Sequence, residues 1–563
     1  MPQKRRIPIF VPLAILACAL AGGFYGPRMP AAAAASEGDD LSPEVSGFTR
    51  AFALVEQNFA DPVSADKAIY KGAIPGMLRT LDPHSNFFDP KEYQLLREDQ
   101  RGHYYGVGMQ VGPRSGKTVV MAPFPGAPAY KAGLRPGDII TKVNDKPTDN
   151  LTTTEVADLL KGQRGTEVTV IVTREGTPQP LSFTMIRDEI SRKSVQDAFW
   201  VKPGIAYVKV LQFAETTSKE LEDNFKRLGE NNVKGLIFDL RDNPGGLLNE
   251  GVAVADRFLQ KNQVVVSHRG RASAEKPYVA RNGNHGRDYP IVVLVSRLSA
   301  SAAEIVAGAL QDHDRAWVLG EKTFGKGLVQ TVFPLSDNTG LALTTAHFYT
   351  PSGRLIQRDY ANQSFYDYYY HRDESAQNSN DVKMTDSGRT VYGGGGITPD
   401  EKYETPRLDR LETELYRDGL FNFTRTYFAS HSPTLPKDWM PDELVLNDLH
   451  DFLLKSGAQS AEAASPLSKP PMPTADAGSR GAQFTEGAFT ADRDWIVRNL
   501  GKEMYTTAFN VDVADQFYSR TDPEVARAVD AMPKATALLE SAKKIVVQRM
   551  HSQPGAPGAA AQR

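Results

Sequence analysis

The sequence predicts a multidomain α/β protein, and three observations lead to this prediction. Over residues 205–350, short apolar runs rich in β-branched residues alternate with amphipathic helical patterns, as in βαβ crossovers that bury a sheet. Residues 103–187 contain short β-rich runs separated by glycine and proline turns. Apolar residues at helical spacing dominate before residue 95 and after residue 400. We therefore expect a βαβ core, a smaller β-rich module and helical regions at both ends.

Length and composition limit the class of protein. The chain has 563 residues, which allows three or four domains of roughly 150 residues each. It carries 65 Lys and Arg against 68 Asp and Glu, a net charge of −3, so the basic excess typical of nucleic-acid binders is missing. The single cysteine excludes a disulfide framework and every metal or iron–sulfur site that needs several thiolates.

The N-terminus has the pattern of an export segment. Basic residues at 4–6 precede an apolar run over 7–24, and alanines follow at 31–35. This order is typical of a secretory signal, and the run is also close to the roughly 20 residues that span a bilayer. Residues 1–35 are interpreted as a signal peptide or an N-terminal membrane anchor. We expect the rest of the chain to be exported, either periplasmic or anchored on the outer face of the cytoplasmic membrane.

The segment that follows, residues 36–95, is predicted to be helical. Apolar residues at helical spacing cover residues 43–60 and 68–78. Pro83 disfavours a helical conformation at the residue before it, so the pattern ends near Asp82.

A compact β-rich module occupies residues 96–187. Its β-rich runs alternate with two helical pieces, at 127–132 and 153–161. The second piece opens with Thr152 and Glu155, which have the spacing of an N-terminal capping box. The order of strands and helices is that of a small peptide-binding module.

The predicted core occupies residues 188–400. We expect four strands that alternate with three helices, and then a hairpin. The strands are predicted at 206–210, 236–240, 291–295 and 316–319, the helices at 218–228, 248–259 and 303–311, and the hairpin at 328–335 and 341–349.

Helical periodicity returns after residue 400, and the composition divides this part further. The predictions are a helical C-terminal region at 401–455, a flexible linker rich in Ala, Ser, Pro and Gly at 456–490, a second helical region at 491–550 and a disordered tail at 551–563.

Three segments that follow predicted strands carry residues suited to catalysis. In residues 299–304, Ser301 lies between a strand and a helix, where helix N–H groups favour a nearby oxyanion. In residues 325–330, Lys326 lies between two glycines, and a buried amine can be neutral near pH 7 and act as a base. In residues 239–246, paired glycines allow the backbone to approach a ligand.

Each of these segments also has a purely structural interpretation. Ser301 and Glu304 have the spacing of a capping box, Lys326 suits a solvated turn, and the paired glycines suit a tight turn. The aromatic run at 365–371 is interpreted as a packed loop, with a surface that stacks on a sugar, a lipid or a partner as the alternative.

Taken together, the motifs over residues 41–400 resemble those of the carboxyl-terminal processing peptidases, also called tail-specific proteases. The matching strings follow the order of that family and are LDPHS at 81–85, YGVG at 105–108, AGLRPGDII at 132–140, DLRDNPGG at 239–246, SASAAE at 299–304, GEKTFGKG at 320–327, YTPSGR at 349–354 and GITPD at 396–400.

The resemblance implies a fold and a site. The fold would be a crotonase-like βαβ protease core with an inserted PDZ domain of the α+β class, and with helical N- and C-terminal regions. Position by position, Ser301 would be the nucleophile, Lys326 the general base and Gln330 the residue that orients the lysine amine. The backbone N–H groups of Gly246 and Ala302 would form the oxyanion hole. No metal or other cofactor is implied.

The same resemblance assigns peptide binding to the PDZ domain. A loop there would receive the C-terminal carboxylate of a substrate, and the strand after it would pair with the peptide. The residues of this loop are Tyr105, Gly106, Val107 and Gly108. The family further implies protein or peptide substrates with exposed C-termini, a homo-oligomer and, as an option within the family, an adaptor protein.

The expected function is that of an exported serine endopeptidase, which recognises protein C-termini and hydrolyses nearby bonds through an acyl-enzyme formed by a Ser–Lys dyad. The alternative from another class is a non-catalytic PDZ scaffold or chaperone whose protease fold is inactive. That alternative predicts decay of the dyad, whereas Ser301, Lys326 and Gln330 are all in place.

Overall fold

The computed structural model describes residues 42–114, 116–196, 198–360, 364–370, 381–436, 438–462 and 485–552. The predicted export segment, most of the predicted linker and most of the predicted tail lie outside these residues. The chain divides into two units, Met1–Gly76 and Met77–Arg563. No helix in the described ranges is both long enough and apolar enough to cross a membrane.

The first unit is helical where it is described. It contains α2 (Ser42–Asn58), α3 (Ala65–Ala68) and the π-helical turn η1 (Ile69–Ala73). Helix α2 matches the helix predicted at 43–60, and none of its residues is buried.

The second unit contains a strand that sequence periodicity does not predict. After α4 (Ile74–Arg79), the short strand β1 (Asn86–Phe88) interrupts the segment predicted to be helical at 36–95. It pairs antiparallel with β18 (Gly340–Tyr349). A run of three residues is too short to carry a periodic signal, so this strand depends on its distant partner. Helix α5 (Pro90–Arg101) then follows.

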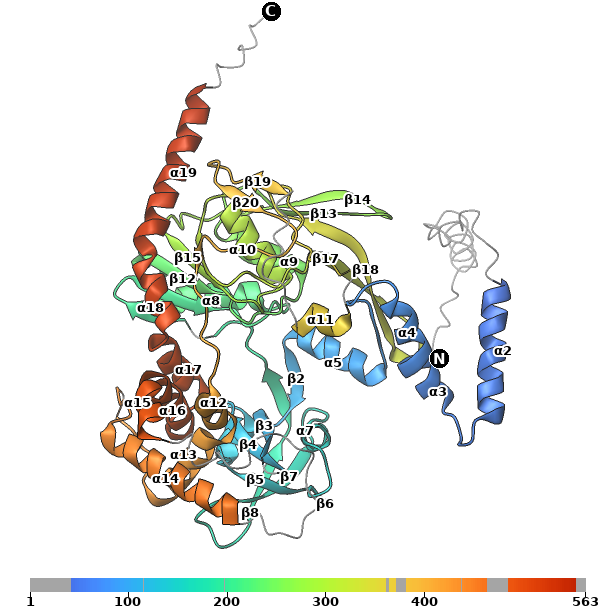
Figure 1. Cartoon of the computed structure of the whole chain (residues 1–563), viewed down its shortest axis with the longest axis vertical. Helices are drawn as coiled ribbons and strands as arrows, with labels where there is room; N and C mark the ends of the chain where they lie inside the picture. Colours follow the sequence, from blue (N-terminus) through green and yellow to red (C-terminus); the bar gives the residue numbers. More distant parts are fainter. Residues whose placement is uncertain are drawn as a thin grey trace, which may run out of the picture. The chain divides into compact units, whose positions relative to one another are not determined.

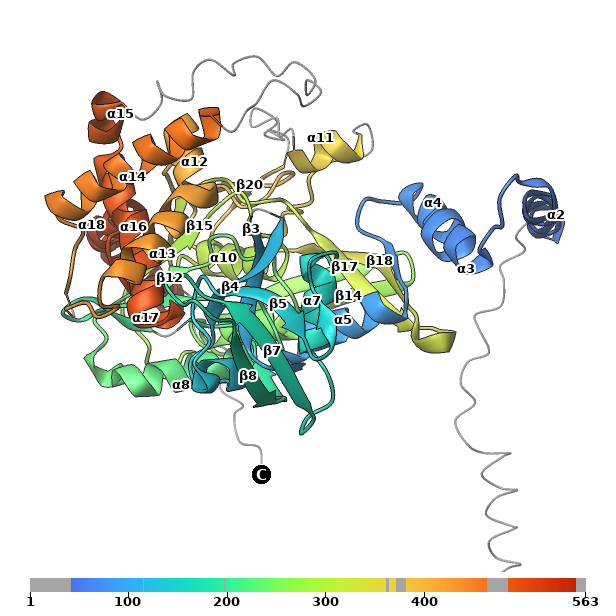
Figure 2. The same ribbon diagram turned by 90° about the horizontal axis from the view of Figure 1, so that it is seen from below.

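The β-rich module is a six-stranded sheet in the order β3-β4-β5-β7-β8, with β6 paired to β5. Helix α7 packs beside β3, β4 and β5 (Figure 2). Its predicted capping box is confirmed, because Thr152 N–H donates to the Glu155 carboxylate and Thr152 Oγ1 accepts the Glu155 N–H. The elements are β3 (Met109–Arg114), β4 (Lys117–Pro123), α6 (Pro128–Ala132), β5 (Ile139–Val143), β6 (Lys146–Pro147), α7 (Thr153–Leu160), β7 (Glu167–Thr173) and β8 (Leu181–Ile186).

The module is an insertion in the chain. Its entry strand β2 (His103–Gly106) and its exit strand β9 (Asp188–Ser191) pair antiparallel with each other. The two connections to the rest of the unit therefore run side by side, which is the arrangement expected of a domain inserted into a loop of another domain.

The core sheet has the order β10-β11-β12-β15-β16-β21. All neighbours from β11 to β21 pair parallel, and only the edge strand β10 is antiparallel, so the predicted βαβ crossovers are confirmed. The elements are β10 (Phe199–Lys202), β11 (Ile205–Lys209), α8 (Thr217–Leu228), η2 (Glu230–Asn232), β12 (Gly235–Asp239), α9 (Leu248–Asp256), β15 (Ile291–Val295), α10 (Ala302–Asp312), β16 (Trp317–Gly320) and β21 (Glu401–Lys402).

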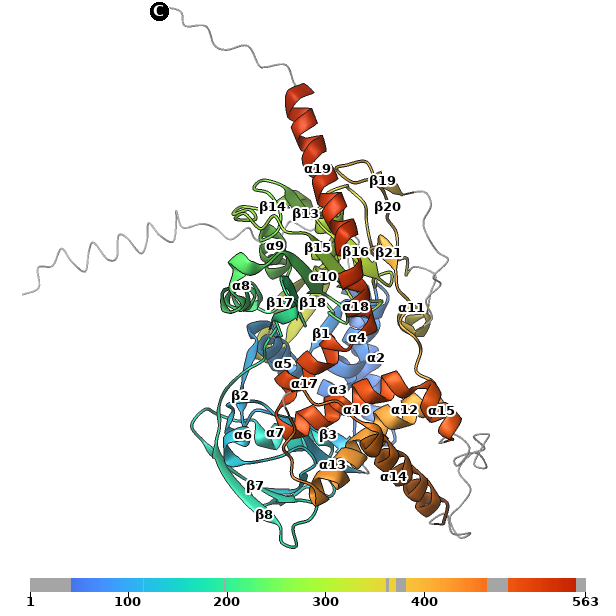
Figure 3. The same cartoon turned by 90° about the vertical axis from the view of Figure 1, so that its left-hand side faces the viewer.

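Both faces of the core sheet are covered. Side chains alternate along a strand, so in β12 Leu236 and Phe238 join the core that includes residues of α8, α9 and α10, whereas Ile237 faces the opposite way. That opposite face packs against α18 (Pro523–Asp530) and α19 (Met532–Ser552), which lie across the sheet in Figure 3. The C-terminal helices thus cover the second face of the sheet, which explains why its strands are apolar on both faces, as the sequence predicts for a buried parallel sheet.

A second sheet lies next to the core, in the order β1-β18-β13-β14 with β17 paired to β18. The predicted hairpin corresponds to β17 and β18, and β13 and β14 are two strands that the sequence analysis does not predict. Its strands not yet given bounds are β13 (Val264–Gly270), β14 (Ser273–Val279) and β17 (Leu328–Pro334), and η3 (Ser336–Asn338) lies between β17 and β18. Helix α11 (Phe365–Tyr370) follows in the chain, and then β19 (Val382–Met384) and β20 (Thr390–Tyr392), which form a separate two-stranded sheet.

A cluster of C-terminal helices lies beside the β-rich module (Figure 1). Ion pairs join the two, from Arg425 Nε to Glu175 at 2.8 Å and from Arg114 Nε to Asp418 at 3.4 Å. The elements are α12 (Arg410–Glu414), the π-helical turn η4 (Leu415–Gly419), α13 (Leu420–Ser430), α14 (Glu443–Glu462), α15 (Glu486–Ala491), α16 (Arg493–Ala508) and α17 (Val511–Arg520).

Candidate active site

Three loops leave the carboxyl ends of neighbouring parallel strands in the core sheet. They follow β12, β15 and β16, and carry the three segments that the sequence analysis selects. Carboxyl ends of parallel strands meet at one edge of a sheet, and ligand sites of open α/β sheets lie there. The structure therefore brings together residues that are far apart in the sequence.

Ser301 lies at the start of α10 in a conformation that favours glycine. Its φ is 54° and its ψ is −114°. A non-glycine residue in this conformation is strained, and such strain is typical of functional sites. Neighbouring backbone contacts hold the turn, because Ala300 N–H donates to the Asn243 carbonyl at 2.9 Å and Phe324 N–H donates to the Ser299 carbonyl at 2.9 Å.

The paired glycines lie directly against this turn. A Cβ on Gly245 would lie 2.6 Å from Ser301 Cβ and 3.0 Å from the Ala302 nitrogen, and a Cβ on Gly246 would lie 2.2 Å from the Phe213 carbonyl oxygen. Only glycine fits at both positions. The backbone bridge to Phe213 uses the Gly245 carbonyl and the Leu247 N–H, so it leaves out the N–H of Gly246.

Glu304 joins the serine and lysine segments through a fully buried carboxylate. Its Oε2 accepts the backbone N–H groups of Ser301 at 2.8 Å and Lys326 at 2.9 Å. Its Oε1 accepts the Thr323 hydroxyl at 2.5 Å and the Gly325 N–H at 2.7 Å. Burial raises the pKa of Glu304, and these donors oppose the rise. In the sequence this residue is recognisable only as half of a capping box, because its partners at Thr323, Gly325 and Lys326 are 19 to 22 positions away.

Lys326 places its amine on Gln330, as the resemblance implies. Lys326 Nζ donates to Gln330 Oε1 at 2.7 Å, and Gln330 Nε2 donates to the His84 carbonyl. Burial lowers the pKa of Lys326, while the nearby charges of Glu304 and Asp82 act in the opposite direction. The solvated-turn interpretation of the lysine is therefore wrong, and its environment favours the neutral amine more than water does.

The LDPHS segment is part of the same site, which its position in the sequence does not reveal. Asp82 accepts the N–H groups of His84 at 2.7 Å and Ser85 at 2.8 Å, and the Ser85 hydroxyl at 2.6 Å. Burial raises the pKa of Asp82, but these hydrogen bonds outweigh it, and the net pKa is lowered. The ionised Asp82 fixes the turn that presents the His84 carbonyl to Gln330.

The predicted peptide-binding loop connects β2 to β3 in the module. Tyr105 and Gly106 end β2, and Val107 and Gly108 follow it. Gly108 has a φ of 72°, and a Cβ there would lie 2.4 Å from the Ala127 Cβ, so the turn requires glycine. Strand β3 pairs only with β4 among the described strands, so its other edge, next to α7, is open to an added strand.

Two parts of the chain match families of known proteins. Residues 204–362 match peptidase family S41, and residues 119–174 match a PDZ domain. A carboxy-terminal-processing protease of Bartonella bacilliformis is 40% identical over 297 residues, which cover 52% of this chain and 68% of the relative. A carboxyl-terminal-processing protease of Synechocystis is 39% identical over 295 residues, which cover 51% of this chain and 68% of the relative.

The chain belongs to the carboxyl-terminal processing protease family. The CtpB protease of Bacillus subtilis is 31% identical over 334 residues, which cover 59% of this chain and 68% of that protein. Among solved structures, the photosystem II D1 C-terminal processing protease aligns at 27% identity with a TM-score of 0.33, over 71% of this chain and 94% of that one. The protein is thus a serine peptidase of family S41 that carries a PDZ domain.

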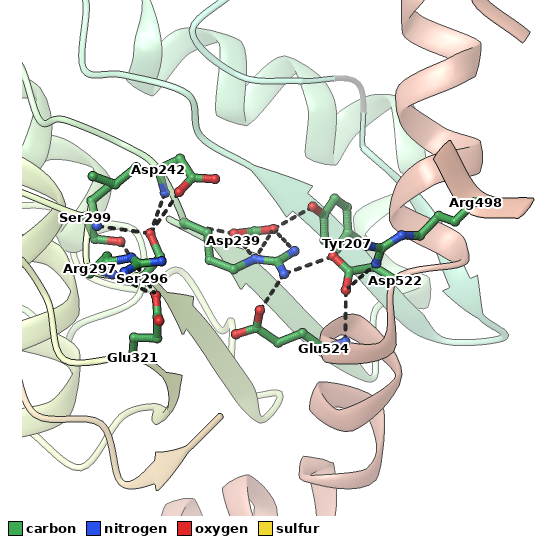
Figure 4. A network of polar contacts seen from close by, with 12 residues as sticks. Tyr207, Asp239, Asp242, Ser296, Arg297, Ser299, Glu321, Arg498, Asp522 and Glu524 are labelled. Atoms are coloured by element: carbon green, nitrogen blue, oxygen red, sulfur yellow. Dashed lines mark hydrogen bonds and ion pairs between the residues drawn. The ribbon is translucent and has the colours of Figure 1, made fainter. Parts of the chain in front are cut away.

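A buried ionic network joins the glycine loop of the protease to its C-terminal helices (Figure 4). Arg241, which opens the loop, contacts Asp239 at 2.6 Å, Glu524 at 2.7 Å and Asp522 at 2.9 Å. Tyr207 donates its hydroxyl to Asp239 at 2.7 Å. The start of the loop is therefore held from both the sheet and α18.

We predict that Glu524 makes the stability of the protease depend on pH. Burial raises its pKa from 4.5 to about 7 and outweighs the charge of Arg241. A carboxyl whose pKa is higher in the folded state contributes stability below about pH 4.5, and this contribution is lost as pH rises through about 7. The loss amounts to up to about 3 kcal/mol, at about 1.4 kcal/mol per pKa unit.

Thermal unfolding of the full chain between pH 5 and 8 measures this effect. Glu524→Gln keeps an oxygen for Arg241 but cannot ionise, so its melting temperature should fall less with rising pH than that of the parent. The exposed residue Glu275 supplies the control Glu275→Gln, which should follow the parent. Parallel curves for all three proteins would contradict the prediction.

Proposed function

We propose that the protein is an exported endopeptidase that binds the C-terminus of a protein substrate through its PDZ domain and cleaves the chain with a Ser301–Lys326 dyad. The shared contact of both segments with Glu304 Oε2 is the observation on which this proposal rests. A single buried oxygen fixes the backbone of the candidate nucleophile and that of the candidate base, and so holds the two residues in one site.

The proposed chemistry assigns one role to each of these groups. The neutral Lys326 amine takes the proton of the Ser301 hydroxyl as its oxygen attacks the scissile carbonyl. The N–H groups of Gly246 and Ala302 stabilise the oxyanion that forms. The lysine then gives its proton to the leaving amine, and an acyl-enzyme remains. A water molecule then loses a proton to the same lysine and attacks the acyl carbon. The tetrahedral intermediate collapses as the lysine returns that proton to the Ser301 oxygen, which releases the acid product and restores the neutral amine.

The PDZ domain would supply recognition. Residues 105–108 end β2 and lead into β3, whose other edge is unpaired among the described strands. A peptide could add a strand along that edge, with its C-terminal carboxylate on backbone N–H groups of this loop. The order of basic, apolar and small residues in 1–35 supports export. We include in the proposal that the catalytic part lies in the periplasm or on the outer face of the cytoplasmic membrane.

Removal of either dyad residue should abolish cleavage. Ser301→Ala and Lys326→Ala should each lower kcat on an unfolded protein substrate by at least about 1,000-fold, because a nucleophile and its base act as one unit. The assay compares the purified full chain with both variants by gel and by mass spectrometry of the products. The controls Ser267→Ala and Lys276→Ala, on the β13–β14 hairpin, should retain activity.

The outcomes of this assay separate the alternatives. Cleavage by Ser301→Ala at the rate of the parent would rule out the Ser–Lys mechanism. Absence of cleavage in every protein, the parent included, would favour the non-catalytic PDZ scaffold.

Activity should rise with pH as Lys326 loses its proton. Burial lowers the pKa of this amine below 10.5, so kcat/KM should climb toward mildly alkaline pH and level off before the range in which ordinary lysines titrate. The measurement is kcat/KM between pH 5 and 10 on a peptide without titratable side chains. A flat profile between pH 5 and 9 would contradict the role of the lysine.

A free C-terminal carboxylate should increase the affinity for a substrate. Hydrogen bonds to a charged acceptor are worth about 1.5–3 kcal/mol, so a peptide with an amidated C-terminus should show a KM higher by about tenfold or more. Its kcat should change little, since the carboxylate would bind the PDZ loop and not the dyad. The comparison uses one peptide in its acid and amide forms, and equal KM values would exclude carboxylate recognition.

A further inference from the structure

The aromatic segment α11 packs on the turn that holds the candidate base. Tyr368 is buried, with 1% of its surface exposed, and its hydroxyl lies 3.0 Å from His84 Nε2. The hydroxyl of Tyr369 lies 3.2 Å from His84 Nδ1 and donates to the Pro83 carbonyl at 3.2 Å. Both rings meet the His84 ring edge to face. We call Tyr368, Tyr369 and His84 the tyrosine clamp.

The hydrogen bonds of the clamp assign a neutral imidazole. Since the Tyr369 proton goes to Pro83, its oxygen accepts the Nδ1–H of His84, and Nε2 accepts the Tyr368 hydroxyl. Gln357 Nε2 donates to the Tyr368 oxygen at 3.3 Å, which completes the chain. Burial is the largest cause that lowers the pKa of His84 to about 4, in agreement with this assignment.

The clamp reaches the lysine through one backbone carbonyl. His84 O accepts Gln330 Nε2, and Gln330 Oε1 accepts Lys326 Nζ at 2.7 Å. An amide has one donor end and one acceptor end, so the His84 carbonyl decides which end of Gln330 faces the lysine. If the carbonyl moved away, the amide could turn and present its NH₂ group to the amine.

A second connection runs to the glycines on both sides of the lysine. Gln357 Oε1 accepts the Gly327 N–H at 2.8 Å, and Arg358 N–H donates to the Gly325 carbonyl at 2.9 Å. The Arg358 guanidinium donates to the Tyr368 carbonyl at 2.5 Å and lies 4.2 Å from the centre of the Tyr368 ring. Tyr368 is thus tied to both ends of the short loop that carries Lys326. The Tyr369 hydroxyl bonds to Pro83 and His84, and its ring lies 6.0 Å from that of Phe324, next to this loop.

We propose that Tyr368 and Tyr369 are positioning residues for the general base, which hold the His84 carbonyl on Gln330 and keep water away from the Lys326 amine. This inference rests on the proposed Ser–Lys function. The charged and titratable groups that act on the amine are Glu304 from α10, and Asp82 and His84 from the turn, and the charge of Arg358 acts on His84. Loss of a clamp hydroxyl would admit water, favour the ammonium form and raise the pKa of Lys326.

The test uses the full chain with Tyr368→Phe, Tyr369→Phe and the double variant. These changes remove hydroxyls and keep the rings, so the fold should persist, and the melting temperature checks this. The matched control is Tyr278→Phe, which removes another Tyr–His contact, 3.3 Å from His268 Nδ1, on the β13–β14 hairpin. The expected result is a fall in kcat of about threefold to tenfold for each clamp variant, as for one lost hydrogen bond, with KM unchanged. Tyr368→Phe should have the larger effect, and the control none.

A second measurement detects the lysine without catalysis. In the Ser301→Ala background, amine acylation is followed from pH 7 to 11, and the peptide with Lys326 is quantified by mass spectrometry against the peptide with the exposed residue Lys276. In the parent, Lys326 should be acylated at lower pH than Lys276. In the clamp variants, the midpoint for Lys326 should move up toward that of Lys276.

The two measurements keep the inference and the proposed function apart. If Ser301→Ala and Lys326→Ala lose activity while the clamp variants keep both kcat and the acylation midpoint of the parent, the inference is wrong and the dyad stands. If Ser301→Ala still cleaves, the proposed function is wrong, and the acylation midpoint alone decides whether the clamp sets the state of the lysine. An unchanged midpoint then overturns the inference as well.

Discussion

The carboxylate of Glu304 is the group on which the arrangement of the site depends. It receives four hydrogen bonds, two from the backbone N–H groups of the candidate nucleophile and base and two from the turn between β16 and the lysine. A buried carboxylate with fewer donors would be costly, since burial disfavours its charge. The loops of β15 and β16 are thus bound to each other by the requirement to satisfy one buried group.

The core sheet explains why these loops meet at all. Parallel strands need crossover helices, and both faces of the resulting sheet must be covered. Helices α8 to α10 cover one face, and α18 and α19 cover the other, although they come from the far end of the chain. Because Glu524 and Asp522 also hold Arg241, the helices that bury this face fix the beginning of the glycine loop. Stability of the sheet and shape of the site are therefore coupled.

Much of this could be predicted from local sequence signals. The apolar run at 291–295 predicts β15 to the residue, and Thr152 with Glu155 predicts the start of α7. The dyad segments and the glycine loop are found because each follows a strand with a strong apolar pattern. Local signals fail where a partner is distant. Strand β1 has three residues and exists through β18, and the bond from Gln330 to His84 joins residues 246 positions apart. The aromatic run at 365–371 is predicted to be a packed loop, but its described part forms the helix α11, in which Tyr368 is buried and Tyr366 is exposed. Its sequence does not say on what it packs.

The charges around Lys326 show how a buried lysine can serve as a base. A carboxylate that paired directly with the amine would stabilise the ammonium form and make a poor base. Glu304 avoids this, because its described hydrogen bonds go to backbone N–H groups and to Thr323, and the amine bonds to the neutral amide oxygen of Gln330. The neutral His84 adds no second cation beside it. Burial therefore lowers the pKa of the lysine against only the longer-range attraction of Glu304 and Asp82, and the amide and the turn behind it decide where the free amine lies.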